Sequence, residues 1–283
     1  MAATRSRHEA AIVLVLVGVL TLTGYQLGRT LGERSGALAT WQRLELFLQE
    51  KRTAEIQALA KAYGPSRYSE HVEEWIVKDF FKDERDGVFV EVGANHHQRF
   101  SNTYYLETVM GWSGVAVEPQ VKFAAGYRQH RPRTTFVPLF ISDVSNRQAT
   151  LYVTENDLVA SGAREFTASF GEVTATTATT STLDDVLDRL GIQRLDFLSI
   201  DIELAEPQAL AGFSIARFAP RLVAIEAHPP VRQQILDYFA RRQYVLLGRY
   251  WQADDDNFWF APLGRTGSGT PLSEERHPAV AHH

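Results

Sequence analysis

Two apolar segments of the chain each end in a pair of ionisable side chains spaced two residues apart. The segment LDFLSIDIE ends with Asp201 and Glu203, and the segment LVAIEAH ends with Glu226 and His228. Residues two apart on a strand point to the same side of a sheet, and parallel strands end at one edge, where ligands bind. We therefore expect these three carboxylates and the imidazole to converge on one crevice.

Two kinds of chemistry fit this cluster, and the residue pattern leaves both open. A crowded carboxylate or an imidazole can accept a proton near neutral pH and act as a general base. Alternatively, Asp201, Glu226 and His228 form an oxygen and nitrogen ligand set that suits Mg or Mn. Glu203 and Glu206 also have a purely structural interpretation, because acidic side chains are favourable in the first turn of a helix.

A glycine turn follows an earlier apolar segment. The sequence VFVEVGAN contains Glu91, Gly93 and Asn95, and a glycine at the end of a strand lets the backbone approach a ligand closely. The turn lacks the GxGxxG pattern of dinucleotide-binding folds, and the chain lacks the GxxxxGK[ST] pattern of phosphate-binding loops. These absences argue against an NAD-dependent enzyme and against a P-loop protein.

The next two segments also end in acidic residues. Glu118 closes the sequence VAVEP, and an acid at the end of the second strand can accept hydrogen bonds from both hydroxyls of an adenosine ribose. Ser142 and Asp143 follow the third segment, where a carboxylate can accept a hydrogen bond from an adenine amino group. The alternatives are a solvated strand end for Glu118 and a turn cap for Asp143.

The elements that must position these residues alternate between strand and helix patterns. Such alternation predicts an α/β fold with a doubly wound, mostly parallel, seven-stranded sheet. We expect strands at 88–92, 115–118, 135–141, 197–201, 222–227, 244–248 and 257–261. We expect helices at 70–81, 102–110, 120–131, 183–190, 207–213 and 230–241. A short extra strand is expected at 149–153, and the Thr-rich stretch 174–182 is either β-prone or a loop.

Composition excludes several classes of function. The chain has 283 residues, of which 45% are hydrophobic, enough for one sizeable core. Its formal net charge of −5 gives no general attraction to phosphate backbones, so we expect no nucleic-acid partner. The absence of cysteine excludes disulfides, thiolate catalysis and cysteine-ligated metals.

The amino-terminal region predicts a membrane anchor. Residues 10–28 carry no charge, and 19 residues at about 1.5 Å rise give roughly 28 Å, close to the hydrocarbon thickness of a bilayer. We expect a short tail at 1–9, a single-pass transmembrane anchor at 10–28, a juxtamembrane helix or stalk at 29–67, a globular domain at 68–263 and a disordered tail at 264–283. The chain is therefore expected at a membrane, and its flanking arginines do not decide the orientation.

Several motifs together resemble one enzyme family. FVEVGAN, SNTYYLE, GWSGVAVEP, TLDDVLDRLGIQRLDFLSIDIELAEPQALAGF and IEAH match the FkbM-type methyltransferases in content and order, over about 88–228. The SNTYYLE and GWSGVAVEP blocks are similar to a membrane-anchored, Star-like branch. The resemblance implies a class I, Rossmann-like fold that uses S-adenosyl-L-methionine to methylate hydroxyls, many of them on glycans or small metabolites.

The resemblance also implies roles for individual residues. The positions that match the cofactor site are Glu91, Gly93, Asn95, Glu118, Ser142, Asp143 and Asp201. Asp201 and Glu203, with Glu226 and His228, match the acidic strand ends beside the methyl group. Asp201 or His228 is then the expected base, oriented by Glu203 or Glu226, while a divalent metal (Mg or Mn) is the less favoured alternative. Because the cofactor is made in the cytosol, a cytoplasmic catalytic domain is the simpler arrangement.

Three departures from the family pattern suggest a rival function. The family usually has Asp where Glu91 stands, a second glycine near His97, and glycine where Leu204 stands. Larger side chains at these positions could narrow the cofactor pocket. The alternative is therefore a catalytically degenerate, membrane-tethered domain used for protein interaction.

Overall fold

The computed structural model describes residues 35–64, 68–155, 159–254 and 256–264. The predicted tail 1–9, the predicted anchor 10–28 and nearly all of the predicted tail 264–283 lie outside these residues. Within the described ranges, no helix combines the length and the apolar character needed to span a bilayer. The chain divides into two compact units, residues 1–55 and 56–283.

The described part of the first unit is helical. The helix α2 (Ser35–Tyr63) begins in this unit, and its last two turns belong to the second. It ends at Gly64, whose φ of +82° is a left-handed conformation and whose N–H donates to the carbonyl of Ala60 at 2.9 Å; Gly is the residue best suited to such a helix end. In the second unit, Ile56, Leu59, Ala60 and Tyr63 pack against the apolar cluster that surrounds α3 (Glu73–Phe81).

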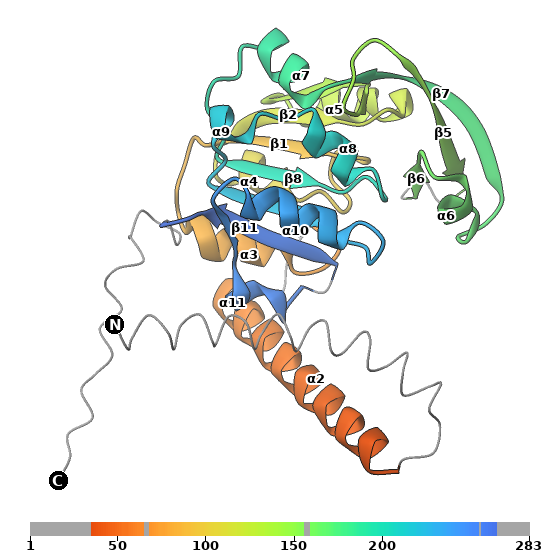
Figure 1. Ribbon diagram of the computed structural model, residues 1–283. Coiled ribbons are helices and arrows are strands. Elements are labelled where there is room, and N and C mark those ends of the chain that lie inside the picture. The colour runs from red at the N-terminus through yellow and green to blue at the C-terminus, as the bar shows by residue number, and fades with distance from the viewer. Residues whose placement is uncertain (1–34, 65–67, 156–158, 255, 265–283) are drawn as a thin grey trace. The chain divides into compact units, whose positions relative to one another are not determined.

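A seven-stranded sheet forms the centre of the second unit (Figure 1). Its strand order is β10-β11-β9-β8-β1-β2-β3, and β11 alone runs antiparallel to its neighbours. The predicted mostly parallel, doubly wound sheet is confirmed. The strands are β1 (Val88–Val92), β2 (Ser113–Val117), β3 (Thr134–Val137), β8 (Phe197–Ile200), β9 (Leu222–Glu226), β10 (Tyr244–Leu246) and β11 (Asn257–Pro262).

Helices cover both faces of this sheet, so its inner strands are apolar on both sides. Alternate residues of β1 show the division: Val90 and Val92 pack in one core cluster, and Phe89 packs in another. The first cluster contains residues of α7 (Leu183–Arg189), α8 (Glu206–Ala211), α9 (Ile215–Phe218) and α10 (Arg232–Ala240). The opposite face is covered by α3, α4 (Tyr104–Thr108), α5 (Ala124–His130) and α11 (Gly248–Trp251).

A second, four-stranded sheet of order β4-β7-β5-β6 lies beside the carboxyl ends of β1, β2 and β8 (Figure 1). Its strands are β4 (Phe140–Ile141), β5 (Gln148–Thr154), β6 (Ala160–Ser161) and β7 (Val173–Ser181). The short helix α6 (Arg164–Ala168) connects β6 to β7. The extra strand predicted at 149–153 is therefore β5, and the Thr-rich stretch is strand β7, consistent with the β-branched shape of Thr.

Several predicted boundaries are wrong for local reasons. The strand predicted at 135–141 is divided into β3 and β4, because Pro138 has no N–H to continue a ladder. The strand predicted at 244–248 ends at Leu246, and α11 begins at Gly248. The helix predicted at 120–131 starts as the 3-10 turn η1 (Val121–Phe123) before α5. The sequence pattern did not indicate α6, α9, α11 or β6.

Candidate active site

A cleft of about 490 Å³, its mouth included, lies between the ends of the central strands and the second sheet. Four of the cofactor residues predicted from sequence line the cleft, namely Gly93, Asn95, Glu118 and Asp201, and so does Glu203. Further lining residues are Val92, Val117, Pro119, Gln120, Leu139, Phe140, Ile141, Leu151, Ala160 and Ile202.

Gly93 brings two strand ends into close contact. Its φ is +83°, and an ideal Cβ at this position would lie 1.7 Å from the backbone oxygen of Asp201. Any side chain would therefore push β1 and β8 apart at the cleft. Backbone hydrogen bonds also join the end of β1 to both neighbouring strands. The Gly93 N–H donates to the Val117 carbonyl of β2, and the Asp201 N–H donates to the Val92 carbonyl of β1. The glycine is needed for the shape of the site.

Glu118 lies directly after β2, with its carboxylate held by backbone groups. One oxygen accepts a hydrogen bond from the N–H of Asn95 at 3.2 Å, and the other accepts one from the N–H of Gln120 at 2.9 Å. The Gln120 side chain also hydrogen-bonds to this carboxylate, and of the roughly four lone-pair sites of its two oxygens one remains for a ligand hydroxyl. Burial raises the pKa of Glu118, and the backbone donors oppose that shift.

Glu91, Ser142 and Asp143 do not line the cleft. Glu91 alternates with Val90 and Val92, so it faces the side of the sheet covered by α4 and α5. There it accepts hydrogen bonds from the Ser101 and Thr103 hydroxyls and the Asn102 N–H.

Burial raises the pKa of the Glu91 carboxyl, while the positive charge of Arg131 acts in the opposite direction. Ser142 donates through its backbone N–H to the Ser181 carbonyl, and Asp143 is exposed.

His97 and Leu204, which were predicted to narrow the cofactor pocket, also lie outside the cleft. The His97 ring stacks on the His130 ring at 4.7 Å, and it leaves no room for a Cβ at Gly126. Burial lowers the pKa of His97 to about 4. The Leu204 side chain packs against the core cluster that contains α8 and α10. Neither residue is part of the lining.

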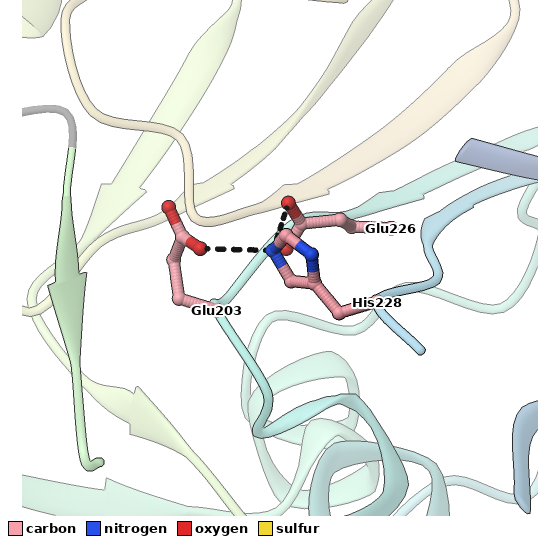
Figure 2. A group of neighbouring side chains, drawn as sticks. All are labelled: Glu203, Glu226 and His228. Carbon is pink, nitrogen blue, oxygen red and sulfur yellow. Dashed lines mark hydrogen bonds and ion pairs between the residues drawn. The ribbon is translucent and has the colours of Figure 1, made fainter. Parts of the chain in front are cut away.

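The predicted cluster of acids and histidine does assemble (Figure 2). Nε2 of His228 lies 2.8 Å from Oε1 of Glu226 and 3.3 Å from Oε2 of Glu203. The three side chains come from different places: the turn after β8, the last residue of β9, and the segment after β9. Hydrogen bonds to Glu203 and Glu226 raise the pKa of His228 to about 10.

Asp201 joins this cluster through Glu226. Its carboxyl hydrogen-bonds to Glu226, and burial together with the negative charges of Glu226 and Glu203 raises its pKa well above the ordinary value. Asp201 nevertheless opens to solvent through the cleft. Because solvent reaches it, the repulsion between carboxylates is the stronger reason for the shift. Glu206 lies beneath the cluster and is completely buried; burial and the charge of Glu226 raise its pKa to about 8.

The turn that carries Glu203 has an uncommon backbone conformation. The φ angles of Glu203 and Leu204 are +57° and +78°, and left-handed residues other than glycine cost on the order of 1–3 kcal/mol each. Sequence periodicity placed Asp201 and Glu203 on one continuing strand, whereas β8 ends at Ile200. The left-handed turn, rather than strand alternation, brings Glu203 to His228.

The second sheet supports this turn. Ser161 of β6 is buried, and its hydroxyl donates to the backbone oxygen of Glu203 at 2.5 Å while accepting from the N–H of Ala163 at 3.0 Å. From α6, the Phe166 ring packs 5.1 Å from the ring of His228. Sequence reasoning missed both contacts, because neither β6 nor α6 has a periodic pattern long enough to predict it.

The family described as the methyltransferase FkbM domain matches residues 91–246, more than half of the chain. No curated protein matches the chain. One similar solved structure is a TehB-like SAM-dependent methyltransferase from Corynebacterium glutamicum. It is 12% identical, the match covers 76% of this chain and 97% of that one, and the TM-score is 0.39.

Proposed function

The chain belongs to the FkbM methyltransferase family, and we propose that it transfers the methyl group of S-adenosyl-L-methionine to a hydroxyl oxygen of a glycan or small metabolite. The observation that carries this proposal is the cleft in which Gly93, Glu118 and Asp201 lie together at the ends of β1, β2 and β8. The cleft combines a glycine, where the backbone can approach a ligand closely, with the carboxylates of Glu118 and Asp201.

The residues of the cleft fit the cofactor. The absent side chain at Gly93 leaves the ends of β1 and β8 close enough to form the floor of the cleft, and the Glu118 carboxylate can accept a hydrogen bond from a ribose hydroxyl. Leu139, Ile141 and Leu151 give the same cleft an apolar wall suited to a purine ring. When bound, S-adenosyl-L-methionine supplies an electrophilic methyl group on a positively charged sulfur.

The chain itself contributes positioning and a proton acceptor. Holding donor and acceptor in register supplies most of the rate in such a direct transfer. As the acceptor oxygen bonds to the methyl carbon, the carbon–sulfur bond breaks and its electron pair stays on sulfur. The acceptor hydroxyl loses its proton to Asp201, the acid that opens into the cleft. His228 is less suited to this step, because two carboxylates already bind its Nε2.

Glu203 and Glu226 act in this proposal through their neighbours. Glu226 hydrogen-bonds to Asp201 and contacts His228, so it orients both groups. Glu203 lines the cleft between the second sheet and Asp201, on the side from which an acceptor reaches the acid. The second sheet then forms one wall of the acceptor site.

Methyl transfer from a labelled cofactor tests the proposal. The purified full-length chain is incubated with methyl-labelled S-adenosyl-L-methionine and a panel of hydroxylated acceptors, including glycans and small metabolites. The proposal predicts a labelled ether product, which Asp201→Asn abolishes while the exposed-site control Asp237→Asn does not. Label on nitrogen or carbon of every productive acceptor, or full turnover by Asp201→Asn, would overturn it.

The membrane anchor at 10–28 is proposed on the sequence alone. Its uncharged length suits one bilayer crossing, and the use of a cytosolic cofactor supports a cytoplasmic catalytic domain. Extraction of membranes at alkaline pH tests the anchor: full-length chain should stay in the membrane pellet, and a chain lacking residues 1–28 should be released.

A further inference from the structure

The cluster of Glu203, Glu226 and His228 has the arrangement of a three-ligand metal site. Each residue offers one ligand atom, and the three atoms lie within 4.8 Å of one another. The two contacts of His228 are 2.8 and 3.3 Å. Neighbouring ligands of an octahedral ion that binds at 2.0–2.1 Å are separated by about 3 Å, so the two contacts of His228 have the spacing of neighbouring ligands.

A second observation points to a missing cation. Glu226 is 9% exposed, and apart from its contact with the Asp201 carboxyl, its Oε2 is buried without a hydrogen-bond partner among the described residues. Figure 2 shows its carboxylate directed toward His228 and Glu203. Oε2 of the fully buried Glu206, whose charge acts on Glu226, also has no partner in the described part of the chain. Buried carboxylate oxygens almost always have a donor or a cation.

The number of carboxyl groups around the cluster also favours a bound cation. Asp201, Glu203, Glu206 and Glu226 place four carboxyl groups around the imidazole of His228, and no Lys or Arg side chain in the described ranges forms an ion pair with Glu203 or Glu226. Buried carboxyl groups in this number are paired, protonated or bound to a metal. A divalent cation would satisfy Glu226 and reduce the repulsion with Asp201.

From these observations we infer that Glu203, Glu226 and His228 bind a divalent cation of the Mg or Mn class. Carboxylate ligands suit Mg and Mn, and three protein ligands leave coordination positions open. This ligand set differs from the one that strand periodicity suggested, because Glu203 replaces Asp201, which opens into the cleft instead. The inference that a cation binds depends only on the geometry of this cluster, and not on the proposed methyl transfer.

Its chemical use rests on the proposed methyl transfer. An acceptor hydroxyl on an open coordination position would lose its proton more readily, because a cation stabilises the alkoxide. The proton would then pass to Asp201, beside the cluster. The cation would thus bind and polarise the acceptor on the side of the cleft formed by Glu203.

Manganese is the probe that tests the inference. The full-length chain is stripped with EDTA, and Mn²⁺ binding is measured by the loss of the free-ion electron paramagnetic resonance signal, without cofactor or acceptor. We expect one ion per chain, with binding weakened at least tenfold in Glu203→Gln and in Glu226→Gln. Glu172→Gln, which changes an exposed acid on the second sheet side of the molecule, should bind as wild type.

The experiment separates this inference from the proposed function. Glu118→Gln should keep Mn²⁺ binding and weaken binding of S-adenosylhomocysteine. Glu203→Gln should weaken Mn²⁺ binding and keep binding of S-adenosylhomocysteine. Thermal melting of each variant identifies a loss of fold, and two ligand variants make the test independent of either one. No Mn²⁺ binding by the folded wild-type chain, or equal binding by wild type and both ligand variants, would show that the cluster is only an ion-pair network.

Discussion

The backbone oxygen of Asp201 occupies the space into which a side chain on residue 93 would project. An ideal Cβ on Gly93 would lie 1.7 Å from this oxygen. The ends of β1 and β8 can therefore lie this close together only because residue 93 has no side chain. This contact places the glycine turn and the acid cluster in the same cleft.

Gly93→Ala should therefore destabilise the chain and abolish cofactor binding. The left-handed φ and the clash with Asp201 together should cost more than about 2 kcal/mol. The matched control is Gly248→Ala, because Gly248 has no positive φ and no neighbouring atom within 4 Å of an added Cβ. Denaturant unfolding measures both variants, and equal stability of the two would contradict the close contact.

Ser161→Ala should lower turnover without weakening the binding of S-adenosylhomocysteine. The hydroxyl of Ser161 supports the left-handed Glu203 turn, but Ser161 does not line the cleft. Ser169→Ala is the control, since Ser169 also donates to a backbone oxygen, that of Phe166, but at an exposed position. If both serine variants turned over at the wild-type rate, Ser161 would have no role in positioning Glu203.

The buried pair of Arg131 and Glu107 should be essential for stability. Nε of Arg131 lies 2.5 Å from Oε2 of Glu107, and both side chains are almost fully buried. Arg131→Met leaves the buried Glu107 carboxylate without a positive partner, with only the Arg133 N–H and the Thr134 hydroxyl as donors, and should cost about 3–5 kcal/mol. Arg133→Met removes an exposed pair with Asp86 at 3.7 Å and should cost less than about 1 kcal/mol. Urea unfolding compares the two, and similar losses would contradict the difference in burial.

Glu73 should make stability decrease as pH rises through the mildly acidic range. Burial and the charge of Asp254 raise the pKa of Glu73 to about 7, from an ordinary value of 4.5. The folded chain then binds more protons than the unfolded chain between these values, so this contribution is complete below pH 4.5 and is lost by about pH 7.

Glu73→Gln should remove this dependence. Glutamine resembles the protonated acid, so the variant should gain stability relative to wild type at pH 8, on the order of 1–3 kcal/mol, and little at pH 4.5. Chemical denaturation at several pH values measures the difference. A difference that is constant with pH would mean that Glu73 titrates normally in the folded chain.

Much of the fold could be predicted from sequence because its inner strands are short, apolar and regularly spaced. Phe89, Leu198 and Val223 belong to strands whose residues are buried on both faces, and such segments have a strong pattern. The division of β3 from β4 at Pro138 was also within reach, since proline cannot donate to a ladder. The second sheet was harder, because β4 and β6 have only two residues each.

The candidate site was predictable where it depends on strand ends and not where it depends on turns. Glu118 and Asp201 reach the cleft because they directly follow β2 and β8. Glu91 belongs to the same motif, yet strand alternation directs it to the opposite face, where it accepts hydrogen bonds from Ser101 and Thr103. The left-handed conformation of Glu203 has no sequence signal, because the residue that follows is Leu rather than Gly.

Binding of S-adenosylhomocysteine to the full-length chain is the most direct measurement of whether the cleft holds an adenosyl cofactor. Titration calorimetry should give one site per chain, with binding at least tenfold weaker, a loss of about 1.4 kcal/mol, in Glu118→Gln and unchanged in Glu172→Gln. Melting curves confirm that each variant is folded. Absence of binding by the folded wild-type chain, or equal affinity for wild type and Glu118→Gln, would contradict the assignment of the cleft.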